Sequence, residues 1–213
     1  MYYNYLIFLF IFLLANLSAQ DTSATTLLDQ KVRQFLEEKH GTWRDMNVPE
    51  SDGKYLFDLI IKNNYTKALE IGTSTGHSSI WIAWALSKTG GRLITIEINN
   101  RRYEQAVEHF KQAGLEDYID ARLADAHELV PEVEGPFDFV FCDADKDWYT
   151  RYFESVWAKI EQGGCFTAHN VLNSGRSGIR QFLKHIEHIK DAETQLIRSS
   201  SSGISVTQKV KPR

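Results

Sequence analysis

Short apolar runs alternate with longer amphipathic stretches along most of this chain. Five runs rich in β-branched and aromatic residues are typical of buried strands: they span residues 67–71, 92–97, 119–124, 137–142 and 165–168. The stretches with apolar residues on one helical face span residues 21–39, 56–61, 78–86, 101–113, 149–160 and 179–189. Two further strand-like runs, 193–197 and 204–210, close the chain.

This alternation predicts an α/β fold. We expect a Rossmann-like, doubly wound, mostly parallel seven-stranded sheet with helices on both faces and a C-terminal antiparallel hairpin strand. Ligands of such sheets bind beyond the carboxyl ends of the strands, near the point where the strand order reverses. The residues that directly follow each strand are therefore the first place to look for function.

The first twenty residues differ from the rest of the chain. They carry no charged side chain, and residues 6–15 are all apolar. That run is short for a membrane span, which needs about 20 residues, and suits the core of a signal peptide. We expect residues 1–19 to be a signal peptide cleaved after Ala19, which exports the protein to the periplasm or out of the cell. An uncleaved membrane anchor and a buried hydrophobic arm are the alternatives, and residues 20–213 are expected to form a single domain.

Composition excludes several classes of protein. The chain has 24 Lys and Arg, 28 Asp and Glu and a formal net charge of -4, without a basic cluster. This argues against a nucleic-acid binder that is held by bulk charge. The two cysteines, Cys142 and Cys165, rule out a disulfide-rich scaffold and are expected to be buried thiols.

Small and acidic residues follow the first three predicted strands. Gly72 and Gly76 lack the dinucleotide-binding spacing, but a glycine-rich loop still lets a ligand approach the backbone. Glu97 ends the second strand, where an acid can accept hydrogen bonds from both hydroxyls of a ribose. Asp125 follows the third strand and either meets an adenine amine or caps the next helix. Together these residues predict an adenosine-type ligand.

Charged side chains crowd the ends of the next two strands. Three aspartates and Lys146 lie between residues 143 and 147, and His169 and Asn170 follow the neighbouring strand. A carboxylate, an imidazole and an amide at adjacent strand ends can converge on a cation. The plainer alternative for the first of these loops is a solvated cap.

In combination, these motifs resemble the metal-dependent O-methyltransferases, the family that includes catechol O-methyltransferase and the caffeoyl-CoA O-methyltransferases. The resemblance runs from Met46 to about Val210. It rests on Met46-Asn47-Val48 with Gly53, on Leu69-Glu70-Ile71-Gly72 with Gly76-His77-Ser78, on Ile96-Glu97, and on residues 137–146 (FDFVFCDADK). His77 stands where the family usually has tyrosine.

The resemblance implies a class I S-adenosylmethionine (SAM)-dependent O-methyltransferase, so residues 20–213 would be one methyltransferase domain. Its acceptor would be a small phenolic or catechol-like molecule with a hydroxyl group. The implied SAM-binding residues are Met46, Val48, Glu70, Gly72, Gly76, Ser78, Glu97, Asp125 and Asp143. Lys146 matches the general base, and Asp143, His169 and Asn170 match the ligands of a divalent metal that chelates two vicinal oxygens of the acceptor.

His169 is the main departure from the family, which has aspartate at this position. An imidazole nitrogen is a poor ligand for Mg²⁺ and suits Zn²⁺, Fe²⁺, Co²⁺ or Ni²⁺ better. The identity of the predicted metal therefore stays open, with His169 disfavouring Mg²⁺.

Two other functions compete with methyl transfer. A methyltransferase fold that binds without turnover would fit an exported chain that carries His169, since SAM is made in the cytoplasm. A nicotinamide-dependent oxidoreductase is opposed by the missing glycine fingerprint. We expect no nucleic-acid partner and no membrane contact except through residues 1–19 if they are uncleaved, and a homodimer is left open.

Overall fold

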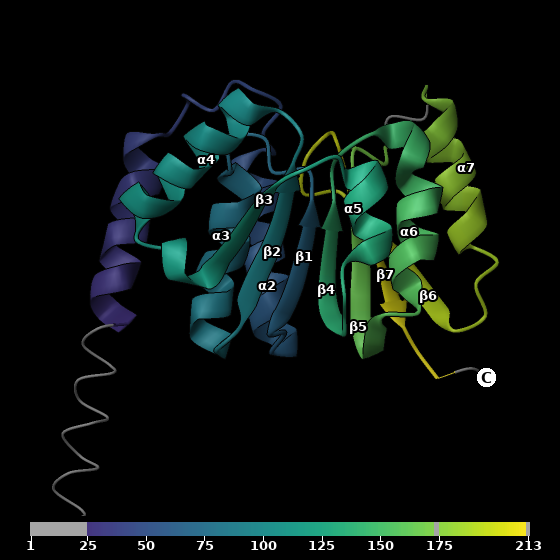
Figure 1. Cartoon of the computed structure of the whole chain (residues 1–213). Coiled ribbons are helices and arrows are strands. Elements are labelled where there is room, and N and C mark those ends of the chain that lie inside the picture. Colours follow the sequence, from purple (N-terminus) through teal and green to yellow (C-terminus); the bar gives the residue numbers. More distant parts are fainter. Residues whose placement is uncertain (1–24, 173–174, 212–213) are drawn as a thin grey trace, which may run out of the picture.

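A computed structural model describes residues 25–172 and 175–211. Its strands are β1 (Lys67–Ile71), β2 (Arg92–Glu97), β3 (Ile119–Leu123), β4 (Phe137–Cys142), β5 (Ile160–His169), β6 (Ala192–Ile197) and β7 (Ile204–Lys209). They form one sheet in the order β3-β2-β1-β4-β5-β7-β6 (Figure 1). The strands from β1 to β5 pair in parallel, whereas β7 is antiparallel to both β5 and β6. The predicted fold class is confirmed.

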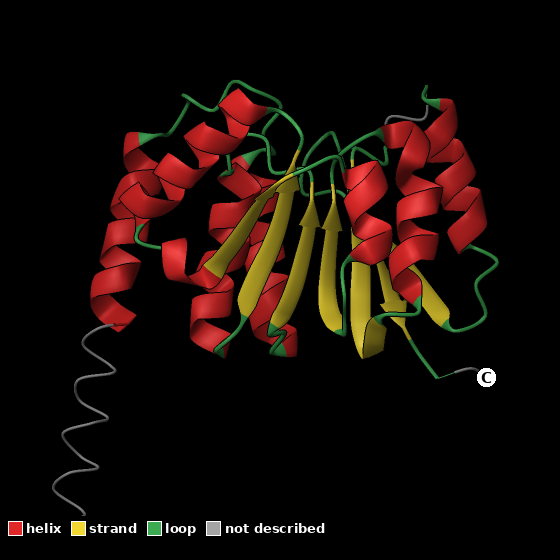
Figure 2. Ribbon diagram, in the orientation of Figure 1, coloured by secondary structure: helices red, strands yellow, loops and turns green. Residues whose placement is uncertain are grey.

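Helices cover both faces of the sheet (Figure 2). After a helix over residues 25–38 come α2 (Glu50–Asn63), α3 (His77–Thr89), α4 (Asn100–Ala113), α5 (Ala126–Glu132), α6 (Tyr149–Trp157) and α7 (Ser177–Ile186). The helices up to α4 pack into one apolar cluster, and those from α5 to α7 pack into a second. Successive side chains of β4 serve both clusters: Phe139 and Phe141 lie in the first, Val140 and Cys142 in the second.

Three elements differ most from the sequence prediction. The helix α2 begins at Glu50, six residues before the predicted start at residue 56. The helix α5 was not predicted, because it is short and contains Pro131, a residue that normally argues against a helix. The strand β5 begins at Ile160 rather than at Cys165, so it takes up the end of the predicted helix 149–160. The turn of 3₁₀ helix η2 (Lys146–Trp148) links β4 to α6.

The predicted signal peptide, residues 1–19, lies outside the described residues. Within 25–172 and 175–211, no helix is both long enough and apolar enough to cross a bilayer.

The strand order reverses between β1 and β4, which lie side by side at the centre of the sheet. The loops that follow them diverge from a point of close contact. A Cβ atom at Gly72 would lie 2.8 Å from the carbonyl oxygen of Asp143, and the φ of Gly72 is +99°. Both the contact and the backbone conformation require glycine there. The open edge at this reversal is where the fold places a ligand.

Candidate active site

A cavity of about 660 Å³ opens at the carboxyl ends of the parallel strands. Ten of the twelve predicted site residues line it: Met46, Val48, Gly72, Ser78, Glu97, Asp125, Asp143, Lys146, His169 and Asn170. We call the part formed by residues 46–48 and the loops after β1, β2 and β3 the cofactor half. The acceptor half is formed by the loops after β4 and β5 and by the β6–β7 loop. The structure therefore brings most of the predicted site residues together in one place.

Glu97, at the end of β2, is the fixed acid of the cofactor half. Its Oε2 atom accepts a hydrogen bond of 2.8 Å from the backbone N–H of Ser74, and its Oε1 atom accepts one of 2.8 Å from Asn99. The side chain is buried. A carboxylate has about four acceptor positions, so each oxygen keeps room for one further donor. This is the geometry that would receive the two hydroxyls of a ribose.

The segment 45–48 is tied across the loop after β1. The Asn47 amide donates to Thr75 Oγ1 at 2.7 Å, and the Ser74 hydroxyl donates to the Asp45 carbonyl. Three residues that line the cavity, Met46, Ser74 and Asn170, have a positive φ, which is costly for residues other than glycine. The surrounding hydrogen bonds hold this backbone in place and shape the rim of the cavity.

His77 anchors the same segment from α3. Its Nδ1 atom donates to the Val48 carbonyl at 2.8 Å, and its Nε2 atom accepts from the Trp81 indole at 3.1 Å. Burial lowers the pKa of His77 by more than the bond to Val48 raises it. The imidazole is therefore neutral and serves as a structural link between α3 and the segment 45–48.

Two predicted cofactor residues do not line the cavity. Glu70 is fully buried below the loop and accepts hydrogen bonds from the hydroxyls of Ser79 and, at 2.6 Å, Thr95. Burial raises the pKa of Glu70 to about 7 against the lowering effect of its hydroxyl partners. At Gly76, a Cβ atom would lie 2.6 Å from the Phe110 ring. Both residues support the loop from behind, and their contact with a cofactor stays a prediction.

Asp125 caps a helix and lines the cavity as well. Its Oδ1 atom accepts from the His127 N–H at 2.9 Å, at the start of α5. The His127 ring stacks on Trp148 with centroids 3.8 Å apart, and lies between Asp125 and Asp145. The helix-cap alternative is thus confirmed, without removing Asp125 from the cavity.

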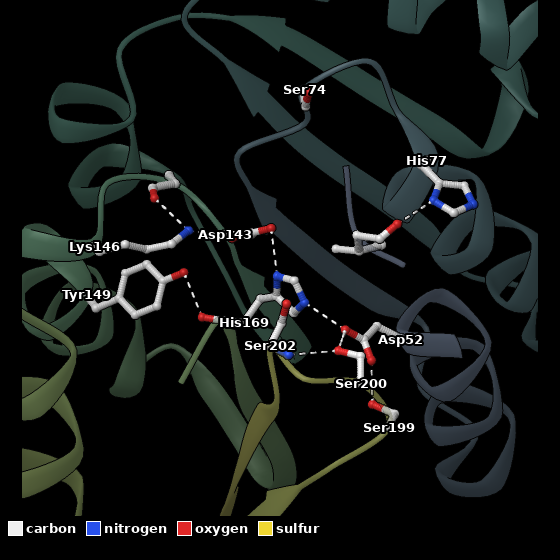
Figure 3. A network of polar contacts seen from close by, with 12 residues as sticks. Asp52, Ser74, His77, Asp143, Lys146, Tyr149, His169, Ser199, Ser200 and Ser202 are labelled. Atoms are coloured by element: carbon white, nitrogen blue, oxygen red, sulfur yellow. Dashed lines mark hydrogen bonds and ion pairs between the residues drawn. The ribbon is translucent and has the colours of Figure 1, made fainter. Parts of the chain in front are cut away.

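The acceptor half is dominated by a chain of charged side chains (Figure 3). His169, at the end of β5, donates from Nδ1 to Asp143 Oδ2 at 3.1 Å and from Nε2 to Asp52 Oδ2 at 2.8 Å. Lys146 donates to the other oxygen of Asp143 at 2.5 Å and to the Ala144 carbonyl at 3.0 Å. Asp52, His169, Asp143 and Lys146 thus form a continuous chain of ion-pair contacts.

Asp52 belongs to this network, and the sequence prediction did not include it. It is fully buried in α2 and also accepts hydrogen bonds from Ser199 at 2.5 Å and Ser200 at 2.6 Å. A signal was present in the sequence, because Asp52 lies four residues before Leu56 and so shares its buried helix face. An acid on the apolar face of an amphipathic helix needs a partner.

The partners of His169 determine its charge. Burial alone would lower the pKa of its imidazole, but hydrogen bonds and attraction from Asp143 and Asp52 raise the pKa to about 9. Burial would likewise raise the pKa of Asp52, and the hydrogen bonds from His169, Ser199 and Ser200 more than offset it, leaving that pKa below its usual value. His169 is therefore an imidazolium between two carboxylates at neutral pH.

This arrangement does not fit a divalent metal. A histidine ligand must offer a nitrogen lone pair, whereas both ring nitrogens of His169 donate to carboxylates. Within the described part of the chain, no group of three or more His, Cys, Asp or Glu side chains is arranged to hold a metal ion. The predicted ligands Asp143, His169 and Asn170 do line one cavity, but the histidine is committed to protein partners.

Similar solved structures have the same fold along nearly the whole chain. An O-methyltransferase from Bacillus cereus in complex with SAH is 27% identical, with a TM-score of 0.74 over 91% of this chain and 97% of that one. The O-methyltransferase TomG from Streptomyces achromogenes, involved in tomaymycin synthesis and solved with SAM, is 26% identical with a TM-score of 0.73, over 91% of this chain and 96% of its own.

Sequence relatives carry the names that the motifs suggest. A catechol O-methyltransferase of Niastella koreensis is 36% identical over 135 residues, which are 62% of this chain and 61% of the relative. A caffeoyl-CoA O-methyltransferase 1 of Zea mays is 33% identical over 163 residues, 73% of this chain and 62% of the relative. This chain thus spans about three-fifths of the length of these relatives. The profile of the O-methyltransferase family matches residues 17–190. With its fold and its strand-end residues, the chain belongs to the O-methyltransferase family.

Proposed function

We propose that the protein is a SAM-dependent O-methyltransferase that acts on a small acceptor with a phenolic hydroxyl. One observation carries the proposal: a single cavity contains both the backbone-anchored Glu97 and, in its other half, Lys146. The structures with bound SAH and SAM support the cofactor, and the names of the relatives support the class of acceptor.

In this proposal, the cofactor half binds and orients SAM. Glu97 accepts hydrogen bonds from the ribose hydroxyls, and Asp125 lies where the adenine amine would be met. Gly72 lets the cofactor approach the backbone, while Met46 and Val48 cover it. Holding the sulfonium methyl at a fixed place replaces a bimolecular encounter by a positioned one.

The acceptor half supplies the base. Lys146, an ammonium in its ion pair with Asp143, first gives up a proton to solvent, and its Nζ lone pair then takes the proton of the acceptor hydroxyl. The oxygen then attacks the methyl carbon in line with the departing sulfur, which leaves a methyl ether, SAH and a protonated Lys146. The sequence predicts assistance by a metal at Asp143, His169 and Asn170, but the observed side chains do not fit one, so no step uses a metal.

A methyl-transfer assay tests the proposal. The purified protein is incubated with methyl-labelled SAM and a panel of phenols and catechols. We expect label in at least one acceptor, with one SAH formed for each ether. Saturable SAM binding without transfer to any acceptor would contradict catalysis and favour the diverged binding protein.

We also propose export, supported by the uncharged apolar run of residues 6–15. The match to the family profile does not include this run and begins at residue 17. The full-length chain with a C-terminal tag should be shortened at Ala19 and found outside the cytoplasm. A full-length chain in the cytosolic fraction would contradict export, and one in the membrane fraction would favour the anchor.

A further inference from the structure

The geometry points to His169 as a built-in replacement for the metal. Its side chain closes the predicted metal site, and the protein methylates its acceptor without a divalent ion. This inference rests on the proposed methyl transfer. It also sets the class of acceptor, because an enzyme without a chelating metal does not require two vicinal oxygens.

The hydrogen bonds of His169 carry the first step. Ionised carboxylates only accept hydrogen bonds, so the two contacts to Asp52 and Asp143 use both ring nitrogens as donors. His169 is only 3% exposed. Releasing Nε2 toward a metal would leave the fully buried Asp52 without its cation, which is strongly unfavourable, and releasing Nδ1 would break the contact that joins His169 to Asp143.

The contacts of Asp143 carry the second step. Both of its oxygens already face protein nitrogens: Oδ1 lies 2.5 Å from Lys146 Nζ, and Oδ2 lies 3.1 Å from His169 Nδ1. A metal at Asp143 would have to displace one of these contacts. An aspartate at position 169 would free Oδ2 and add an anionic oxygen.

The packing around Asp52 carries the third step. Ser199 and Ser200, on the loop between β6 and β7, both donate to Asp52, and the Ser202 N–H donates to Ser200 Oγ at 3.1 Å (Figure 3). Ser202 in turn lines the cavity. Thus a helix, a strand end and a distant loop together fix His169, so the predicted metal site is closed by several elements.

The consequence for the acceptor concerns its oxygens. A chelating metal selects catechols, because it binds two neighbouring oxygens at once. Here Lys146 is the group that meets the reacting hydroxyl, and one hydroxyl is enough for it. We therefore expect a phenol with one hydroxyl to be methylated as readily as the catechol of the same skeleton.

Metal binding and transfer are measured on the full chain. Calorimetry with Mn²⁺, Co²⁺ and Zn²⁺ in the presence of SAH should show no saturable site. Methyl transfer to a matched phenol and catechol should be unchanged in excess chelator. Saturable binding of one metal per chain, or activity that is lost in chelator and restored by a divalent cation, would overturn the inference. Failure of SAM binding or of all transfer, with and without metals, would instead refute the proposed function.

Two variants sharpen the test. His169→Asp should gain saturable metal binding, because it supplies an anionic oxygen ligand and frees Asp143 Oδ2 from the imidazole. His188→Asp, at an exposed position of the same chain, should bind no metal. Far-UV circular dichroism confirms that each variant is folded. A folded His169→Asp variant that binds no metal would show that His169 is not what closes the site.

Discussion

The two halves of the cavity use the same kinds of residue in opposite ways. In the cofactor half, Glu97 is held by two backbone N–H groups and keeps acceptor positions for a ligand. In the acceptor half, Asp143 is paired with the protein's own cations, Lys146 and His169, and His169 pairs in turn with Asp52 behind the cavity. A carboxylate at a strand end is thus open to a ligand when the backbone positions it, and closed when a side-chain cation does.

Two buried histidines differ in the same way in their partners and in their pKa values. His77 and His169 are each 3% exposed. The partners of His77 are a carbonyl and an indole, and its pKa is lowered, whereas the partners of His169 are two carboxylates, and its pKa is raised to about 9. The type of partner, and not the depth of burial, decides the charge of a buried imidazole.

The largest expected effect is on turnover. Lys146→Gln should lower the rate of methyl transfer by about 10²–10⁴-fold, the usual scale for a lost general base, with SAM affinity nearly unchanged. Single-turnover kinetics and calorimetry separate the two quantities, and Lys190→Gln, at an exposed site, is the control. A variant that loses affinity but turns over normally when saturated would make Lys146 a binding residue.

The next effect concerns stability of the acceptor half. Asp52→Ala removes one partner of a buried ion pair, so the free energy of unfolding should fall by about 3–5 kcal/mol. The matched control is Asp58→Ala on the same helix, whose exposed pair with Lys54 is worth at most about 1 kcal/mol. Urea unfolding measures both. Equal effects of the two substitutions would mean that the Asp52–His169 pair is not holding α2 to β5.

A smaller effect is expected in the cofactor half. Glu97→Gln should weaken SAM binding by about 1.5–3 kcal/mol, because a charged acceptor is lost from both ribose hydrogen bonds. Glu116→Gln, exposed and away from the cavity, should leave the affinity unchanged. Calorimetric titration of SAM into both variants decides it, and an unaltered affinity in Glu97→Gln would take Glu97 out of the cofactor site.

A further effect is the opposite pH dependence of the two histidines. The raised pKa of His169 gives a stabilisation that is complete below its ordinary pKa of about 6.5 and is lost as the pH rises through about 9. The lowered pKa of His77 gives one that is complete above about 6.5 and is lost as the pH falls. Unfolding measured across this range should lose its alkaline decline in His169→Asn and part of its acid decline in His77→Asn. The same profile in both variants would remove this distinction.

Much of the fold could be predicted from the sequence because the buried strands read as short apolar runs with clear boundaries. The strands β1, β2 and β4 were predicted with their observed bounds. The helix α5 was missed, since a seven-residue helix with an internal proline gives little periodicity.

The cofactor half could be predicted because its residues follow strands whose ends must meet. For the acceptor half, the sequence predicts which residues lie at the strand ends, but not which side chains they pair with. Matching His169 to a metal ligand does not reveal that its Nε2 atom donates a hydrogen bond to Asp52, which is 117 residues away in the sequence. Nor does the serine run 199–202 indicate that two of its hydroxyls fix that aspartate.

The most direct test of both halves is a crystal structure of the protein grown with SAH and excess Mn²⁺, with anomalous scattering recorded. Our account predicts the ribose hydroxyls within hydrogen-bond distance of Glu97, the sulfur directed toward the Lys146 side of the cavity, and His169 between Asp52 and Asp143 without an anomalous peak. An anomalous peak between Asp143 and Asn170, with His169 turned to ligate it, would contradict the closed acceptor half. SAH bound away from Glu97 would contradict the cofactor half.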